Sequence, residues 1–276
     1  MPPVITSRSG GILLPLLISL AVPSSCSVLE DRDDCPCRLR VEVRKRCRLT
    51  PEREVQLCLR SDMTPISREE TRPLAEWQDL QFEMQIPKGT IRADGYVGLQ
   101  HCERVNGCLM IPYGQPTDSL YWVSGTARAV GETAVLPLRI RKEYCRLSLE
   151  FLYDEEGPYP YSTTIRSTTA GLLLTDGTPV AGPFLCTPDE TSPGHFETLL
   201  PRQLTPDDLI LEIRDKGATA PPLTEIPLGR LISSSGAFSW EDEDLKDLLL
   251  RFDYAHAELT LQVMDWELGQ VFTYII

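Results

Sequence analysis

The amino-acid sequence predicts an all-β protein built from antiparallel β-sandwiches. Several short segments alternate apolar and polar residues, which is typical of a strand with one buried and one wet face. Turn sequences such as Asn106-Gly107 and Asp176-Gly177 lie between these segments. The chain has 23 prolines against 18 glycines, and prolines at this density leave little room for long helices.

Five strands follow from this alternation. Apolar side chains occupy every second position in each of them and the positions between are mostly polar, so one face of each strand is expected to pack on a core. The apolar sets, in chain order, are Leu39/Val41/Val43, Val55/Leu57/Leu59, Phe82/Met84/Ile86, Leu147/Leu149/Phe151 and Leu259/Leu261/Val263.

One short helix is expected near the C-terminus, over residues 239–252. Ser239 can cap it, and the acidic residues 241–244 fill its first turn, where the helix dipole favours anions. The acidic run lacks the alternating ligands and central glycine of an EF-hand, so a capped helix is favoured over a calcium loop. The apolar residues that follow at helical spacing are Leu245, Leu248, Leu249 and Phe252.

The composition narrows the class of protein. Hydrophobic residues make up 42% and charged residues 24% of the chain, as in an ordinary folded protein. Lys and Arg number 27 against 40 Asp and Glu, for a formal net charge of −13. A nucleic-acid binder needs a basic face to displace counterions, so nucleic acid is not an expected partner.

Residues 1–25 are predicted to be a signal peptide that is removed. The apolar run 11–22 is uncharged and shorter than the roughly 20 residues that span a membrane. Ser24-Ser25-Cys26 resembles a lipobox, in which the cysteine is acylated and becomes the mature N-terminus, although Pro23 stands where Leu, Val or Ile is usual. The alternative is ordinary signal-peptidase cleavage with Cys26 in a disulfide.

Residues 26–37 are expected to form a lipidated, acidic tether. The sequence of residues 27–34 is Ser-Val-Leu-Glu-Asp-Arg-Asp-Asp, and repulsion between like charges would hold it open. It also resembles the export address that sends lipoproteins to the outer face of the outer membrane in Bacteroides-type bacteria. The two interpretations are compatible.

The length of the mature chain predicts two domains. About 250 residues lie near the size at which one hydrophobic core splits into two. We place the domains at 38–143 and 144–276, because basic residues within 139–142 interrupt the apolar pattern before a strong strand opens at Cys145.

The nine cysteines suit an exported protein. With Cys26 acylated an even number remains, which allows about a hundred disulfide pairings. The only pair we predict is Cys102–Cys108, which brackets a short loop. Cys35-Pro36-Cys37 is not expected to bind a metal, because the chain has no second such pair and its three histidines are scattered.

The sequence lacks the motifs of common enzymes. It contains no G-x-S-x-G elbow, no phosphate-binding loop, no H-E-x-x-H and no G-x-G-x-x-G. We therefore predict a structural or binding protein with no catalytic residues and no cofactor other than the lipid on Cys26. Tyr159-Pro160-Tyr161 is either a proline-stiffened hairpin loop or a pair of exposed tyrosines that stack on sugars.

The order of the motifs resembles the fimbrial anchor subunits of Bacteroides-type bacteria, the FimB/Mfa-type lipoproteins of type V pili. The resemblance covers nearly the whole mature chain, and it rests on the order of the pieces, since no single piece is specific. The matching pieces are Cys26 with its acidic tether, Cys35-Pro36, residues 82–90, Tyr113-Gly114, Asp118-Ser119-Leu120, His195-Phe196, Leu200-Pro201-Arg202-Gln203, Leu228-Gly229, the segment after Trp240, and residues 263–267.

This resemblance implies two tandem transthyretin-like antiparallel β-sandwich domains. It also implies an outer-membrane lipoprotein at the base of a fimbrium, with palmitate or a similar lipid on Cys26. Such a subunit fixes the fimbrium to the cell surface and limits its length, and its partner is the shaft subunit, a fimbrillin. The alternative is a stand-alone surface lipoprotein, an adhesin or carbohydrate-binding module that contacts a host protein or glycan.

The C-terminal segment is a candidate partner contact. Shaft members of the family polymerise by strand addition, in which an extended segment completes a neighbour's sandwich. The segment could be such a donor strand, or it could be the last strand of its own sandwich, paired with residues 258–266 through Leu268-Gly269. We favour the second, because an exposed apolar strand invites aggregation. The residues concerned are Val271, Phe272, Thr273, Tyr274, Ile275 and Ile276.

Overall fold

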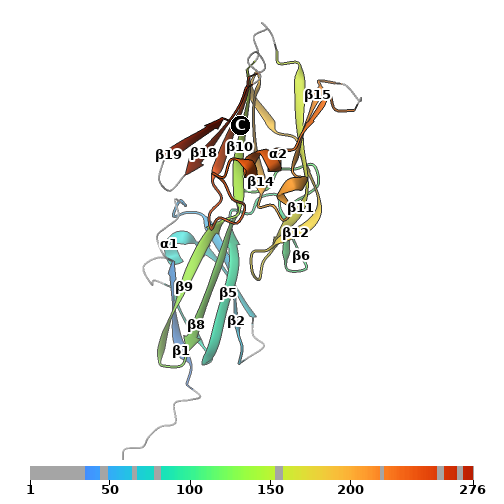
Figure 1. The fold of residues 1–276 in the computed structure, drawn as a ribbon. Helices are drawn as coiled ribbons and strands as arrows, with labels where there is room; N and C mark the ends of the chain where they lie inside the picture. Colours follow the sequence, from blue (N-terminus) through green and yellow to red (C-terminus); the bar gives the residue numbers. More distant parts are fainter. Residues whose placement is uncertain are drawn as a thin grey trace, which may run out of the picture. The chain divides into compact units, whose positions relative to one another are not determined.

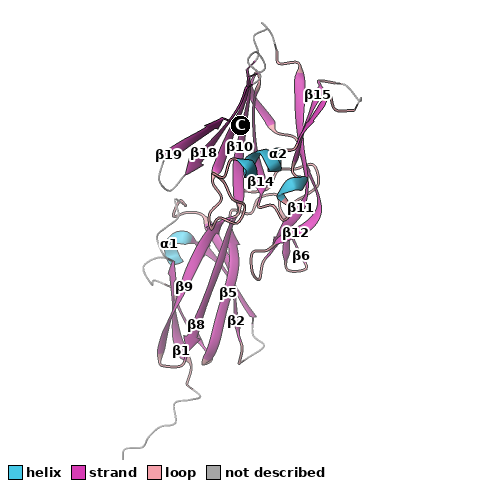
Figure 2. Ribbon diagram, viewed as in Figure 1, coloured by secondary structure: helices cyan, strands magenta, loops and turns pink. Residues whose placement is uncertain are grey.

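Strands make up most of the computed structural model, and its helices are short (Figures 1 and 2). The all-β sandwich fold predicted from the sequence is confirmed. The predicted signal peptide and Cys26 lie outside the described residues. The structure describes residues 35–43, 49–63, 67–77, 82–152, 158–217, 221–253, 258–265 and 270–275.

The first sheet has seven strands, and all but one of its neighbouring pairs are antiparallel. The exception is the pair β1–β9, which is parallel, a pairing that the sequence pattern did not predict. In spatial order the strands are β3 (Ser67–Pro73), β2 (Glu54–Ser61), β5 (Gly89–Val97), β8 (Tyr121–Ala129), β9 (Thr133–Lys142), β1 (Cys37–Val43) and β4 (Glu83–Ile86).

The core of this sheet contains the alternating side chains that the sequence indicated. Leu39 of β1 and Leu57 of β2 belong to one buried cluster although they lie in different halves of the sheet, which shows that the sheet folds over itself. The short helix α1 (Leu74–Trp77) adds Trp77, which is fully buried and lies with its ring centroid 4.5 Å from that of Phe82.

Two further sheets share a second core. In spatial order, one contains β13 (Asp189–Ser192), β14 (His195–Pro201), β10 (Tyr144–Leu152), β17 (Asp247–Asp253), β18 (Glu258–Asp265) and β19 (Gln270–Ile275). The other contains β16 (Thr224–Ile226), β15 (Ile210–Asp215), β11 (Tyr161–Leu173), β7 (Cys108–Met110) and β6 (Glu103–Val105), with β12 (Pro179–Cys186) paired to β11.

These two sheets pack as a sandwich. Leu147 of β10 and Leu248 of β17 share a buried cluster with Ile165 of β11 and Leu211 of β15. The 3-10 helix η1 (Pro206–Asp208) and the helix α2 (Leu228–Ser234) follow β14 and β16 along the chain, and Ile232 of α2 belongs to the same core. Within the described part of the chain, none of the helices has the length and hydropathy that a membrane crossing requires.

The β6–β7 hairpin pairs outside the first sheet. It lies on the N-terminal side of the predicted domain boundary, yet β7 pairs with β11. Its two turn residues, Asn106 and Gly107, have φ values of 49° and 79°. The favoured turn of a two-residue hairpin requires a positive φ at both of these positions. The division at 143/144 stays a prediction.

The predicted Cys102–Cys108 disulfide is wrong. Both thiols are free, as are the other cysteines among the described residues. Cys108 stands opposite Val105 in the β6–β7 ladder, whereas Cys102 lies three residues before Val105, just outside that ladder. At roughly 3.3 Å per residue the two lie about 10 Å apart, beyond the reach of a disulfide. Cys102 instead packs in the second core.

The predicted helix over 239–252 is also wrong. Residues 247–253 form β17, which runs parallel to β10 and antiparallel to β18. Ser239 accepts a hydrogen bond from the backbone N–H of Glu241 at 3.1 Å, but it closes a turn and no helix follows. Burial alternates in this strand with a period of two, with Leu248, Leu250 and Phe252 buried.

Buried charges tie the β9–β10 junction to the loop before β17. Arg202 donates from Nε to Glu143 at 2.7 Å, and its remaining N–H groups donate to backbone carbonyls, including that of Asp242 at 2.8 Å. Lys142, 2% exposed, pairs through Nζ with Asp247 at 2.6 Å. These contacts satisfy charges that would otherwise be costly to bury.

Candidate functional site

The C-terminal strand β19 lies at the open edge of its sheet. It pairs antiparallel with β18, in a register that runs from Asp265 opposite Gln270 to Thr260 opposite Ile275. This is the hairpin arrangement that the sequence favoured over a released strand. The other edge of β19 pairs with no strand among the described residues, and Figure 1 shows β19 at the end of the β10–β18 series.

The structure places only part of the predicted contact segment. Val271 and Thr273 are exposed, and the exposed fraction of Val271 is 57%. For Phe272, Tyr274 and Ile275 the structure describes the backbone alone, and Ile276 lies outside the described residues.

The sequence of β19 differs from that of the other edge strands. Edge strands usually resist pairing with a second chain by means of charged residues or proline. Charged residues occur in β3, β4, β6, β13 and β16, and β12 contains two prolines. Among the described edges, β19, with the sequence Gln-Val-Phe-Thr-Tyr-Ile, alone contains neither. Its free backbone edge is therefore the least protected against strand addition.

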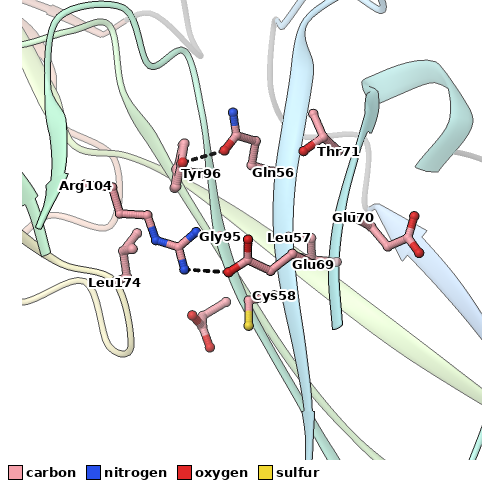
Figure 3. A pocket seen from close by; sticks show the side chains of 11 residues that line it. Gln56, Leu57, Cys58, Glu69, Glu70, Thr71, Gly95, Tyr96, Arg104 and Leu174 are labelled. Atoms are coloured by element: carbon pink, nitrogen blue, oxygen red, sulfur yellow. Dashed lines mark hydrogen bonds and ion pairs between the residues drawn. The ribbon is translucent and has the colours of Figure 1, made fainter. Parts of the chain in front are cut away.

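A pocket lies on the outer face of the first sheet (Figure 3). It encloses about 310 Å³, open space included, between β2, β3, β5 and the side chain of Arg104 from β6. Arg104 reaches Glu69 of β3, with Nη2 and Oε1 2.7 Å apart. Tyr96 donates its hydroxyl hydrogen to Gln56, which stands opposite it on β2.

The strand register explains this grouping. Gln56 faces Tyr96 and Cys58 faces Asp94 across β2 and β5, so these side chains point to the same face. Gly95 lies between them, and a Cβ there would fall 2.0 Å from the carbonyl oxygen of Gln56, so the site requires glycine.

The charges of the pocket largely satisfy one another. The Arg104 hydrogen bond lowers the pKa of Glu69. Burial raises the pKa of Asp94, and Arg60, with Nη1 2.9 Å from Oδ1, opposes that rise. Burial also raises the pKa of Tyr96. These groups are cross-linked by their own hydrogen bonds and ion pairs, and sequence reasoning missed the pocket because its members are spread from Gln56 to Leu174.

Other predicted features are placed as follows. Among the described residues no three His, Cys, Asp or Glu side chains are arranged to hold a metal ion. Tyr159 is 1% exposed and packs against Phe151 with ring centroids 5.5 Å apart. The hypothesis that Tyr159 and Tyr161 form an exposed platform for sugars is therefore wrong, because Tyr159 is part of the core.

No family model matches the sequence, and no curated protein matches it. Solved structures do match. One is a candidate polysaccharide-binding protein from Bacteroides thetaiotaomicron, at a TM-score of 0.60 and 12% identity, covering 88% of this chain and 98% of that chain. Another is a candidate adhesin from Bacteroides ovatus, at a TM-score of 0.60 and 12% identity, covering 87% and 96%.

A third match is the fimbrial anchor protein Mfa2 from Porphyromonas gingivalis. Its TM-score is 0.56 at 12% identity, and the match covers 88% of this chain and 99% of that chain. The chain has the fold of these proteins. The resemblance to fimbrial anchor proteins seen in the order of motifs is thereby confirmed at the level of the fold.

Proposed function

We propose that this chain is a non-catalytic, cell-surface subunit of a fimbrium, which anchors the fimbrium to the outer membrane and limits its length. The observation that supports this most is the unprotected edge of β19 on a fold shared with a fimbrial anchor protein. The matches to an adhesin and a fimbrial anchor protein support the broader class of fimbrial or adhesive surface protein.

The proposed partner is a fimbrillin, which adds a strand beside β19. Main-chain hydrogen bonds along the edge would supply affinity, and alternate side chains of the added strand would supply specificity. Because β19 is hydrogen-bonded to β18 along its length, we propose that it stays in place and receives a strand. Releasing it would break that ladder before a new one forms.

The proposed membrane attachment is a lipid on Cys26. One acyl chain gives only marginal membrane binding, but each buried CH₂ contributes about 0.8 kcal/mol, so two or three chains hold a protein nearly permanently. A fimbrium pulled from outside the cell would then be retained through this subunit.

The edge is tested with a double variant, V271K/T273K, which adds two charges to β19. Lysines on an edge strand oppose pairing with a second chain. The matched control is T133K/V135K, which changes the same residue types at exposed positions of β9, an inner strand of the first sheet whose residues 133–138 pair with β1. We expect V271K/T273K to release fimbriae into the medium, whereas the control retains them. Equal retention by both variants would overturn the proposed edge.

The role in anchoring is tested by deleting the protein. We expect fimbriae that are longer and that appear in the culture medium. Fimbriae of unchanged length that stay attached would refute the anchor function. In that case the stand-alone lipoprotein would be the better interpretation, although the burial of Tyr159 has removed the sugar platform first considered for it.

A further inference from the structure

A trough lies on the outer face of the first sheet, beside the pocket of Figure 3, with which it shares Asp94. It encloses about 1380 Å³ that is open to solvent. Its floor is the outward side of β2, β5, β8 and β9, and Thr175 and Asp176 form part of its wall. We call it the arginine trough, because Arg60, Arg92 and Arg139 line it.

Two of the three arginines are available to a ligand. Arg60 is held by Asp94, with Nη1 and Oδ1 2.9 Å apart. Arg92 and Arg139 are exposed, and among the described residues neither forms an ion pair.

The acidic groups near the trough are engaged elsewhere. Asp176 accepts a hydrogen bond from the backbone N–H of Thr178 at 2.9 Å. Asp62 lies near Arg92, and its Oδ1 accepts the backbone N–H of Thr90 at 2.7 Å. These carboxylates offset part of the arginine charge, but among the described residues neither Asp62 nor Asp176 forms an ion pair with Arg92 or Arg139.

The spacing of Arg92 and Arg139 indicates the kind of anion. Arg92 is opposite Thr126, and Arg139 is opposite Ser124, so one strand, β8, separates the two arginines. Two strand spacings, together with the two-residue offset between Thr126 and Ser124 along β8, place their backbones about 12 Å apart. That distance suits charges on successive units of a polymer better than one small anion. The hydroxyls of Ser124 and Thr126 lie between them and can bond sugar hydroxyls.

We propose that the arginine trough binds an acidic polysaccharide. The guanidinium groups of Arg92 and Arg139 would each form paired hydrogen bonds with a carboxylate or sulfate group of the sugar chain. Trp122 donates a hydrogen bond from Nε1 to the carbonyl of Leu174 at 2.8 Å. This bond holds the segment that leads into Thr175 and Asp176, the wall against which the sugar chain would lie. This binding is separate from the contact proposed for β19.

The test uses the purified, intact lipoprotein and three oligosaccharide probes of equal length. Oligogalacturonate presents carboxylates, heparin oligosaccharide presents sulfates as well, and dextran oligosaccharide is neutral. The variant is R92Q/R139Q, and the matched control R38Q/R230Q removes two exposed arginines from β1 and α2. Affinity is measured by calorimetry at low and high salt, and unfolding temperature is measured for each protein.

We expect at least one acidic probe to bind more tightly than dextran, with affinity that falls as salt rises. R92Q/R139Q should weaken that binding by about tenfold or more, whereas R38Q/R230Q leaves it unchanged. Which acidic probe binds distinguishes carboxylate from sulfate recognition. Binding of neither, or an equal loss in both double variants, would overturn the proposal.

The two proposals fail separately. R92Q/R139Q should still retain fimbriae on the cell, and V271K/T273K should still bind the acidic probe. Loss of fimbriae in R92Q/R139Q at an unchanged unfolding temperature would show that the trough contacts the fimbrium, and would overturn the assignment to a polysaccharide.

Discussion

Gly229 shows how one residue position is fixed by packing. It lies in the first turn of α2, and its N–H donates to the carbonyl of Leu209 at 3.0 Å. A Cβ at this position would lie 1.7 Å from the carbonyl oxygen of Pro206. Leu228-Gly229 is one of the short motifs on which the resemblance to fimbrial anchor subunits rests. The close approach of the Pro206 carbonyl is a physical reason for glycine at this position.

We predict that G229A lowers the free energy of unfolding by about 3 kcal/mol, the upper end of the usual cost of overpacking. The control is G131A, where the nearest atom to an added Cβ is 3.8 Å away, and its effect should stay within about 0.5 kcal/mol. Urea unfolding of both variants measures the difference. Equal stability of the two would contradict the close contact at Pro206.

Arg202 is a buried charge whose partners are distant in sequence. Its ion pair with Glu143 spans 59 positions, so no local pattern predicted it. We predict that R202M lowers the free energy of unfolding by roughly 3 kcal/mol, because the buried Glu143 keeps only its ion pair with Arg141 and the carbonyls that Arg202 contacts lose their donor. The double variant R202M/E143M should lose less stability than the sum of the losses in R202M and E143M. Urea unfolding of the single and double variants checks this, and simple additivity would argue against the pair.

Asp94 connects stability to pH. Burial raises its pKa in the folded protein above the ordinary value of 3.8. Its stabilising contribution is therefore present below the ordinary pKa and is lost as the pH rises through the folded value. The stability of D94N relative to the wild type should then increase from acidic to neutral pH. Urea unfolding at several pH values tests this, and a D94N variant that loses stability relative to the wild type as the pH rises would be the opposite result.

At the level of elements, period-two alternation predicted five strands correctly. It did so because each has one clearly buried face, as in β1, where Leu39 and Val41 are fully buried. The prediction failed for β17. That strand lies between β10 and β18, and its continuous run of Leu248, Leu249 and Leu250 fits a helical spacing as well as a strand. The segment is a strand because it pairs with β10 and β18, which its own sequence does not reveal.

Two leucines distinguish the strand from the helix by experiment. The predicted helix would bury Leu249 and leave Leu250 out of its apolar set, whereas β17 buries Leu250 completely and Leu249 only in part. We predict that L250A lowers the free energy of unfolding by about 3 kcal/mol and that L249A costs about 1 kcal/mol or less. Chemical denaturation compares the two, and the reverse order would support the helix.

At the level of the whole molecule, the sequence predicted the fold but not its surfaces. The order of short motifs from Cys35 to residue 267 was enough to indicate the fold that the solved structures share. The arginine trough could not be predicted, because Arg60, Arg92 and Arg139 come together only through the order of β2, β5, β8 and β9. The β6–β7 hairpin likewise pairs with a strand that follows much later in the chain.

The proposed lipid on Cys26 gives a prediction for the whole molecule. Replacing Cys26 with serine removes the thiol that would be acylated, so the protein should move from the membrane fraction to the soluble fraction, and fimbriae should be shed. Cell fractionation and immunoblotting measure both. A C26S protein that stays in the membrane fraction would show that attachment does not depend on this residue.

The central claim is that this subunit joins a fimbrillin to the outer membrane. The most direct measurement is a pull-down of the intact protein from outer membranes, with mass spectrometry of its partners and of its N-terminal peptide. We predict a fimbrillin in the eluate together with a diacylated or triacylated Cys26. An acylated Cys26 with no pilus subunit would contradict the claim and leave a lipoprotein that acts without a fimbrium.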